Sequence, residues 1–278
     1  MWTYITKKSL ICLWATTLVL FSSAFAEDNY SCVVVTGASG QLGSTITRHL
    51  HDKNYYLILV GRQSEKLNAL HQRYPSSSTV AIDYALPGYI ADYKKTLKEV
   101  NRPIQGLLIM TPRPVWRGVI QPPEAWEATF QTTFIAQTAL IQATLPYLAP
   151  KSTIIIIAGT TSVQLQPAYG LSCIIRRMWT TYAKALTHEL GPKGIRVNVI
   201  SPGVVLTPFH KERIREQAKN HNLSYMEEYN REIKAIPLRR HCEPIELAQT
   251  IEFLLSPSSS FISGINLVLD GGYTSSFN

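Results

Sequence analysis

Three glycines, Gly37, Gly40 and Gly43, are spaced so that they could bring a phosphate group against the backbone. They follow a short apolar run, residues 32–35, which is typical of a buried parallel strand. Apolar residues at helical spacing begin after Ser44, so the glycines form a turn between a strand and a helix. In such a turn the first glycine permits the bend, the second lets the backbone approach a pyrophosphate, and the third lets helix pack on strand. The stretch therefore predicts a dinucleotide site at the start of the helix, where free N–H groups bind phosphate. The alternative is a glycine loop that only turns the chain.

The composition is that of a globular protein with a large core, because 45% of the 278 residues are hydrophobic and 17% are charged. The formal net charge is +8, yet no run of lysine and arginine, and no interleaving of basic with aromatic residues, accompanies it. We therefore expect a basic surface suited to anionic small molecules and no nucleic acid partner. The four cysteines have neither the spacing of metal ligands nor that of a disulfide framework, so no metal site is expected.

Residues 1–26 have the order of a secretory signal: two lysines, an apolar core over residues 11–21, and the sequence Ala-Phe-Ala at 24–26. The apolar core is short for a helix that spans a membrane. We expect cleavage before Glu27, export to the periplasm, and no stable membrane span in the mature chain. No twin arginine precedes the core, so the chain would be exported unfolded and without a cofactor. The alternatives are an uncleaved anchor and a wrongly assigned start codon, which would leave the protein in the cytoplasm.

The rest of the chain, residues 27–278, alternates strands and helices without a repeat or a linker. Such alternation predicts a single α/β domain with a doubly wound parallel sheet of seven strands and helices on both faces. Ligands would then bind at the carboxyl ends of the strands. The expected strands cover residues 32–35, 55–60, 79–82, 105–110, 153–157, 196–200 and 266–269. After the helix at the glycine turn, the expected helices cover residues 64–74, 90–100, 123–148, 173–190, 210–232 (interrupted at 220–223) and 244–255.

Later motifs in the chain are more specific than the glycine turn. Residues 191–198 (GPKGIRVN) are followed by residues 201–203 (SPG) and Thr207, and residues 236–246 are followed by residues 270–272 (DGG). In this order the motifs resemble those of the short-chain dehydrogenase/reductase family, and the resemblance extends over about residues 32–273. It implies a Rossmann-like fold, a nicotinamide cofactor and a small-molecule substrate whose identity the sequence does not give.

The resemblance also implies a homo-oligomer, most often a tetramer in similar proteins. Its interfaces would be the two long helices over residues 123–148 and 173–190 and the C-terminal strand. These helices carry more apolar residues than one sheet-facing stripe requires. The residues concerned are Ile135, Leu140, Ile141, Met178 and Trp179.

The positions that carry catalysis in the family are changed in this chain. Gln41 stands where a glycine is usual in the glycine turn, and Thr133 stands where a helical asparagine supports a proton relay. Aligning residues 183–190 with the family places the usual tyrosine at Ser172 and the usual lysine at Arg176. The usual serine falls on Gly159.

One branch of the family, the enoyl-acyl carrier protein reductases, places its tyrosine seven residues before the lysine, and this spacing from Arg176 gives Tyr169. Tyr169 would donate a proton to the substrate oxygen, while Arg176 lowers the tyrosine pKa and hydrogen-bonds the nicotinamide ribose. Arginine is not a conservative replacement for lysine in this role. A rival spacing pairs Tyr169 with Cys173 and supplies no cation. A hydroxyl of residues 160–162 could replace the missing serine. The alternative is a half-buried loop tyrosine and a surface arginine.

Arg62 decides the expected cofactor, because it follows the second strand, where similar proteins that prefer NADP(H) carry an arginine for the 2′-phosphate. Asp83, after the third strand, resembles the residue that hydrogen-bonds the adenine amine. A solvated arginine and a loop-capping aspartate are the alternatives. The residues expected to contact the cofactor are Gly37, Ser39, Gly40, Gln41, Leu42, Gly43, Arg62, Asp83, Thr111, Arg176, Pro202, Gly203 and Thr207.

Two classes of function are therefore expected. The first is an NADP(H)-dependent oxidoreductase acting on a carbonyl, alcohol or enoyl group. The second is a catalytically silent, exported member of the family that binds a nucleotide or other ligand, or serves as a structural interaction subunit. The export signal favours the second because a periplasm offers little free NADP(H), whereas the intact cofactor half favours the first. The charged helical region over residues 210–232 is the expected lid.

Overall fold

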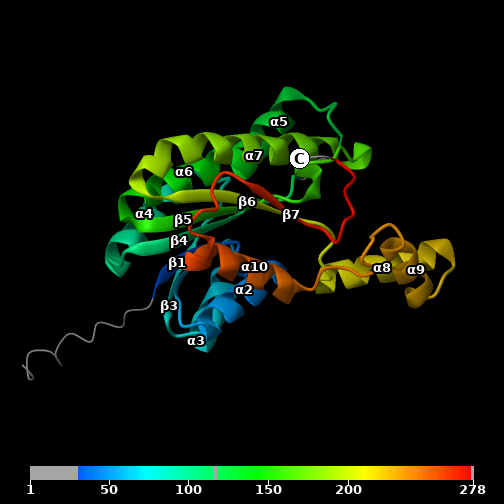
Figure 1. The fold of residues 1–278 in the computed structure, drawn as a ribbon, viewed down its shortest axis with the longest axis horizontal. Helices are drawn as coiled ribbons and strands as arrows, with labels where there is room; N and C mark the ends of the chain where they lie inside the picture. Colours follow the sequence, from blue (N-terminus) through cyan, green and yellow to red (C-terminus); the bar gives the residue numbers. More distant parts are fainter. Residues whose placement is uncertain (1–30, 115–117, 277–278) are drawn as a thin grey trace, which may run out of the picture. The chain divides into compact units, whose positions relative to one another are not determined.

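The computed structural model describes residues 31–114 and 118–276, and from Ser31 onward the chain forms one compact unit. Its centre is a parallel sheet whose strands follow the order β3-β2-β1-β4-β5-β6-β7 (Figure 1). The order reverses between β1 and β4, and open α/β sheets bind ligands beside such a switch point. The seven-stranded, doubly wound parallel sheet expected from the sequence is confirmed. The strands are β1 (Cys32–Thr36), β2 (Tyr56–Gly61), β3 (Ser77–Ala81), β4 (Ile104–Met110), β5 (Leu148–Ile157), β6 (Arg196–Pro202) and β7 (Asn266–Leu269).

Helices cover both faces of the sheet (Figure 1). On one face, α4, α6 and α7 contribute Tyr93, Leu140 and Trp179 to the core. On the other face, α2 and α10 contribute Ile46 and Ile251. The helices are α2 (Gln41–Asp52), α3 (Ser64–Arg73), α4 (Tyr89–Val100), α5 (Pro123–Phe130), α6 (Ala136–Thr144), α7 (Gly170–Leu190), α8 (Pro208–His221), α9 (Tyr225–Ile233) and α10 (Pro244–Leu255).

Four consecutive isoleucines in β5 show why the sheet is covered on both sides. Successive side chains of a strand point to opposite faces. Ile154 and Ile156 accordingly join the core beneath α4, α6 and α7, whereas Ile155 and Ile157 join the core beneath α2 and α10. All four are at most 5% exposed, so a continuous apolar run is the pattern that a strand between two helical layers requires.

The helix expected over residues 123–148 is divided in the structure. Between α5 and α6 the chain passes through a π-helical turn, Gln131–Ile135, and α6 ends at Thr144. A 3-10 turn that contains Pro146 follows, because proline has no N–H with which to continue an α-helix. Strand β5 then begins at residue 148 rather than at the expected residue 153.

Two further boundaries differ from the sequence-based expectation. Helix α7 begins at Gly170 rather than at residue 173, because the 3-10 turn Pro167–Tyr169 leads directly into it. The charged region after β6 forms two helices, as expected, with the break at residues 222–224. Asn222 ends α8 in the left-handed conformation, and Ser224 caps α9 by accepting a hydrogen bond from the N–H of Glu227.

The prediction that five apolar residues of the two long helices face an oligomer interface is wrong for three of them. Leu140, Ile141 and Trp179 are 0% exposed, because they pack against the sheet and α7 packs beside α6. Ile135 is 50% exposed, and Met178 is partly buried on the outer side of α7. Only these last two of the five residues remain candidates for an interface.

The signal sequence expected over residues 1–26 lies outside the described residues, so its cleavage and the export of the chain stay predictions. Within residues 31–114 and 118–276, no helix is both long and apolar enough to cross a membrane.

Candidate active site

The glycine turn has the close backbone packing expected of a dinucleotide site. Gly37 has a φ of +63°, a left-handed conformation that favours glycine. A Cβ at Gly43 would lie 2.1 Å from the carbonyl oxygen of Gly37, and one at Gly40 would lie 3.1 Å from the same atom. Gly40 is the N-cap of α2 and has no side chain to accept from the first turn of the helix. The first N–H groups of α2 therefore remain available to an anion at the carboxyl edge of the sheet.

Gln41 has a role that the sequence did not indicate. Its Oε1 accepts a hydrogen bond from the backbone N–H of Phe209 at 2.9 Å, which joins the glycine turn to the start of α8. Thr207, expected to contact the cofactor, caps the same helix by accepting from the N–H of His210 at 3.2 Å. Leu42 packs against the core beneath α2 and α10. The residue in the place of a family glycine thus joins the start of α8 to the glycine turn.

The remaining residues expected at the cofactor follow the carboxyl ends of several strands. Arg62 is exposed just after β2, and a Cβ at the preceding Gly61 would lie 2.8 Å from the Ser39 hydroxyl, so Ser39 lies against the end of the same strand. Asp83 accepts a hydrogen bond from the N–H of Ala85 at 3.0 Å, which is the loop-capping role considered as the alternative.

Thr111 and Gly203, at the ends of β4 and β6, pack closely against neighbouring parts of the chain. Thr111 donates its hydroxyl to the carbonyl of Ile157 at 2.7 Å, so it ties the end of β4 to the end of β5. Pro202 is buried at the end of β6, and a Cβ at Gly203 would lie 2.9 Å from the Cβ of Asp270. The expected cofactor residues therefore gather along one edge of the sheet, although several side chains already have partners within the chain.

Arg176 lies at this edge and passes over Gly159. Its Nη1 donates a hydrogen bond to the Thr161 hydroxyl at 2.9 Å. A Cβ at Gly159 would lie 2.7 Å from Arg176 Nη1, closer than Cβ contacts normally come. Gly159 also has a φ of +131°, which favours glycine. The chain can place a guanidinium here because residue 159 has no side chain.

The electrostatic environment of Arg176 is unusual for an arginine. Burial, together with the positive charge of Arg113, lowers the pKa of Arg176 to about 10, while Cys173 acts in the opposite direction. The guanidinium therefore stays charged at neutral pH. Arg113 lies in the proline-rich segment after β4, with its guanidinium carbon 5.7 Å from the ring centre of Phe209. No sequence motif indicated Arg113 as a second cation at the site.

Tyr169 is half-buried in the 3-10 turn before α7, about two helical turns from Arg176. Ser172, at the position of the usual tyrosine, is only 5% exposed. The sulfur of Cys173 accepts a hydrogen bond from the N–H of Gln166 at 3.4 Å, so its contacts hold the preceding loop. The action of Tyr169 together with Arg176 stays a prediction.

Of the three hydroxyls that could replace the family serine, two have identified partners. Thr161 accepts from Arg176. The Ser162 hydroxyl lies 2.7 Å from the Ser201 hydroxyl and accepts from Asn266 Nδ2 at 3.2 Å, which joins the 3-10 turn after β5 to β6 and β7. Ser162 is therefore part of the framework of the sheet.

Thr133, in the place of the helical asparagine, lies in the π-helical turn. Its hydroxyl donates to the carbonyl of Thr129 at 2.6 Å, and its own carbonyl accepts from Trp179 Nε1 at 3.1 Å. π-Helical turns occur frequently at functional sites. Here the turn places a threonine that is only 2% exposed beside α7.

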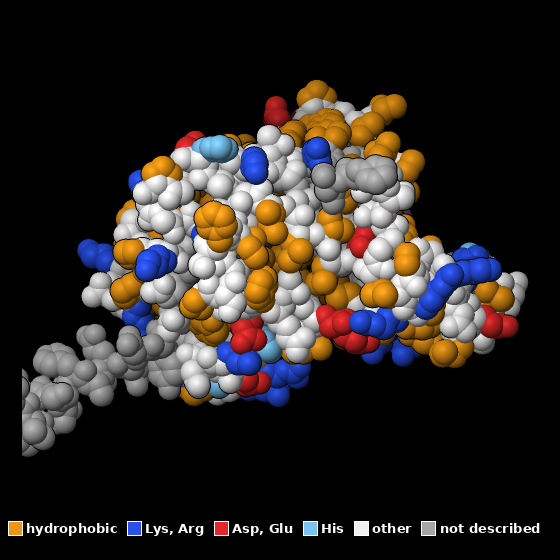
Figure 2. Space-filling model, viewed as in Figure 1, with side chains coloured by type: hydrophobic (Ala, Val, Ile, Leu, Met, Phe, Trp, Pro, Cys, Tyr) orange, Lys and Arg blue, Asp and Glu red, His pale blue; other side chains and the backbone are white. Residues whose placement is uncertain are grey.

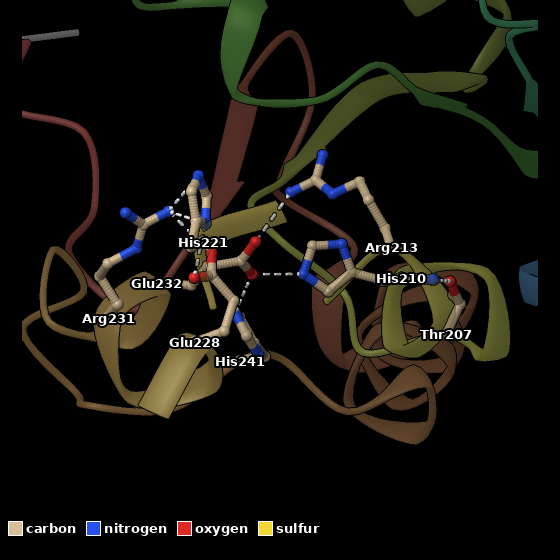
Figure 3. Close-up of polar contacts among 8 residues, drawn as sticks. All are labelled: Thr207, His210, Arg213, His221, Glu228, Arg231, Glu232 and His241. Atoms are coloured by element: carbon tan, nitrogen blue, oxygen red, sulfur yellow. Dashed lines mark hydrogen bonds and ion pairs between the residues drawn. The ribbon is translucent and has the colours of Figure 1, made fainter. Parts of the chain in front are cut away.

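The structure also brings together a group that no sequence motif indicated. His210, Glu232 and His241 meet between α8, α9 and the segment before α10 (Figure 3). These residues are too far apart in the chain for their spacing to reveal the contact.

Known proteins resemble this chain in sequence and in fold. A family model described as enoyl-(acyl carrier protein) reductase matches residues 37–274. L-xylulose reductase from Bos taurus is 27% identical over 248 residues, which cover 86% of this chain and 95% of that protein. L-sorbose reductase from Gluconobacter frateurii, solved with NADPH and L-sorbose, has a TM-score of 0.81 at 22% identity and covers 89% of this chain and 98% of its own.

A further solved structure has the same fold. It is an NADPH-bound short chain oxidoreductase from Pseudomonas aeruginosa PAO1, described as containing an atypical catalytic center. Its TM-score is 0.76 at 24% identity, and the match covers 89% of this chain and 98% of that chain. The family model covers most of the chain, and the sheet order and glycine turn agree with it. The chain belongs to the short-chain dehydrogenase/reductase family of oxidoreductases.

Proposed function

We propose that the protein is an NADP(H)-dependent oxidoreductase that transfers hydride between the nicotinamide ring and a carbonyl, alcohol or enoyl group of a small molecule. The glycine turn and the open start of α2 support a dinucleotide at the carboxyl edge of the sheet. Arg62, exposed after β2, supports recognition of the 2′-phosphate. Two solved structures of the same fold contain NADPH.

The pairing of Arg176 with Gly159 carries this proposal. Burying a guanidinium is costly unless the group is paired or hydrogen-bonded. The chain accommodates one here through a glycine at the position of the family serine and a hydroxyl, Thr161, that accepts its hydrogen bond. The two replacements fit one another in space. This fit favours a site whose catalytic residues have been replaced together over a site that has lost its function. It argues against the catalytically silent alternative.

In the proposed reaction NADPH, when bound, supplies the hydride to the substrate carbon. Tyr169 donates the proton to the substrate oxygen. Arg176 stabilises the tyrosinate that is left and hydrogen-bonds the cofactor ribose, while Thr161 orients the guanidinium. Arg113 adds a second positive charge near Arg176, which favours a ligand with an anionic group at this edge.

The test is NADPH consumption with a panel of carbonyl and enoyl compounds, measured for the wild type, Tyr169→Phe and Ser172→Ala. Tyr169→Phe is expected to lower turnover by about 10²–10⁴ without changing NADPH affinity, because it removes the general acid alone. Ser172→Ala, three residues further along the chain, is the matched control and is expected to change little. If Tyr169→Phe turns over as fast as the wild type, Tyr169 is not the proton donor. If no compound is reduced, the catalytically silent alternative is favoured.

Export to the periplasm is proposed on the sequence of residues 1–26 alone. Export would make NADP(H)-dependent activity harder to sustain, because a periplasm offers little free NADP(H). An exported enzyme would need its own supply of cofactor, and a cytoplasmic form would not.

We also propose a homo-oligomer, with a tetramer expected from the resemblance. A groove lined by Phe134, Ile174, Met178 and Tyr182 runs along the outer side of α7, with a volume of about 680 Å³. Strand β7 is an edge strand of the sheet, and hydrophobic side chains gather over this face of the molecule (Figure 2). Unpaired sheet edges and apolar grooves favour contact with a second copy.

A further inference from the structure

A compact group of three side chains lies where α8, α9 and the segment before α10 meet (Figure 3). His210 comes from α8, Glu232 from α9, and His241 from the segment before α10. The Nε2 atom of His210 is 2.8 Å from Glu232 Oε2, and the Nε2 atom of His241 is 3.3 Å from the same oxygen. One ligand atom from each residue lies within 4.8 Å of the other two. Both imidazoles thus point at one carboxylate oxygen.

His241 is not satisfied by the contacts that the structure describes. Its side chain is 1% exposed, yet neither ring nitrogen has a hydrogen-bond partner among the described residues. The 3.3 Å approach to Glu232 is a contact without the geometry of a hydrogen bond. A neutral imidazole has one donor and one acceptor, so leaving both unpaired in the interior is costly. A cation held between the three residues would use the lone pair of His241 Nε2.

We propose that His210, Glu232 and His241 bind a divalent transition-metal ion of the zinc class. Zinc binds imidazole nitrogen at about 2.0–2.1 Å, so two ligands of a tetrahedral ion are about 3.3 Å apart. The His241 contact already has this separation, and the 2.8 Å contact of His210 needs to open only slightly. Two imidazoles and one carboxylate are a ligand set that suits zinc and leaves a fourth position for water.

The second oxygen of Glu232 is held from outside the group. Arg213 Nη2 donates to Glu232 Oε1 at 3.2 Å, which fixes the orientation of the carboxylate and directs Oε2 toward the two histidines. Carboxylates that bind metal ions are usually hydrogen-bonded in this way. A divalent ion on one carboxylate and two neutral imidazoles leaves a net charge of about +1, so the ligand set offsets half of the charge of the ion.

The proposed ion would join three segments of the chain at one point. Helix α8 is already tied to the glycine turn through the N–H of Phe209 and the side chain of Gln41. An ion on His210, Glu232 and His241 would fasten α8 to α9 and to the segment before α10. Metal binding would therefore stabilise the lid directly, whether or not the protein has the proposed oxidoreductase activity.

The experiment uses the full chain without a polyhistidine tag, freed of metal with a chelator. Zinc titration calorimetry is expected to show one ion per chain, and cobalt in its place is expected to give the visible spectrum of a tetrahedral ion. His210→Ala and Glu232→Gln should each weaken zinc binding by more than about 100-fold, because even the loss of an outer partner costs 10–100-fold. His221→Ala is the matched control. It removes another histidine of α8, 3.0 Å from the buried Glu228 of α9, and should keep full affinity.

Thermal unfolding supplies a second measurement that does not need activity. Zinc should raise the melting temperature of the wild type and of His221→Ala, and should leave that of Glu232→Gln unchanged. Glu232→Gln keeps the size of the side chain, so it tests the site even if His210→Ala fails to fold. The proposal is overturned if the wild type binds no zinc, or if Glu232→Gln binds it as tightly as the wild type. It is also overturned if His221→Ala loses as much affinity as His210→Ala.

Discussion

Introducing a serine at residue 159, where the family carries one, would test how Arg176 is accommodated. In Gly159→Ser the new Cβ would lie 2.7 Å from Arg176 Nη1, so the guanidinium must move away from Thr161. Loss of a hydrogen bond from a charged group costs about 1.5–3 kcal/mol. Gly159 also has φ +131° and ψ 164°, a region that is almost restricted to glycine and costs other residues about 1–3 kcal/mol. The two costs together predict that Gly159→Ser lowers the free energy of unfolding by about 2.5–6 kcal/mol.

A double-mutant cycle separates these two costs. In an Arg176→Lys background the guanidinium is gone, so only the backbone cost of about 1–3 kcal/mol should remain for Gly159→Ser. The expected coupling between the two positions is therefore about 1.5–3 kcal/mol, the value of the displaced hydrogen bond. Gly88→Ser is the matched control. Gly88 has a φ of +78°, and a Cβ there would have nothing within 4 Å, so its cost should be the same in both backgrounds.

Urea unfolding of the wild type, the single variants and the double variant measures the cycle. The reasoning is refuted if Gly159→Ser costs the same in the wild-type background and in the Arg176→Lys background. A coupling at Gly88 as large as that at Gly159 would also refute it, because the effect would then not depend on contact with the guanidinium.

Four further predictions concern the cofactor, the stability, the assembly and the leader. Arg62→Ala should weaken NADPH binding by roughly tens-fold and leave NADH binding nearly unchanged, because Arg62 would contact only the 2′-phosphate. Equal losses of affinity for both nucleotides would show that Arg62 does not recognise the 2′-phosphate. Hydrogen bonds from Arg240 and from a backbone N–H lower the pKa of Glu246 to about 2, so its contribution to stability is present above about pH 4.5 and is lost as the pH falls toward 2. Glu246→Gln should therefore lower the melting temperature at neutral pH and matter progressively less in acid, and an effect independent of pH would contradict this. Met178→Asp should reduce the size of the assembly measured by sedimentation, whereas a wild type that is monomeric at micromolar concentration would rule out the oligomer. N-terminal sequencing of protein made in a Gram-negative host should begin at Glu27, and an intact Met1 on cytoplasmic protein would contradict the expected signal.

The architecture could be predicted because its determinants are local. Burial on both faces and a tight turn are properties of a short segment. The roles of the isoleucines of β5 and of the glycines after β1 can therefore be predicted from a few neighbouring residues. Helix ends were predicted less well. The end of α6 depends on Pro146, but the π-helical turn before it and the early start of α7 have no comparable local signal.

The candidate site shows the opposite situation. The family resemblance indicated Arg176 and Gly159 separately, but their contact depends on how α7 packs over the end of β5. Burial of Leu140 and Trp179 likewise depends on α6 and α7 packing side by side, so their apolar character did not show that they face inward. His241 could not be linked to α8 and α9 from its position in the sequence, because only the tertiary fold brings it there.

Titration of the full chain with NADPH and with NADH, followed by the fluorescence of the reduced nicotinamide, tests the proposed cofactor site most directly. The open start of α2, the glycine turn and the exposed Arg62 lead us to expect saturable binding of both nucleotides, with NADPH bound more tightly. Absence of saturable binding by either nucleotide would contradict the proposed oxidoreductase outright, whatever the tests of Tyr169 and Arg176 show.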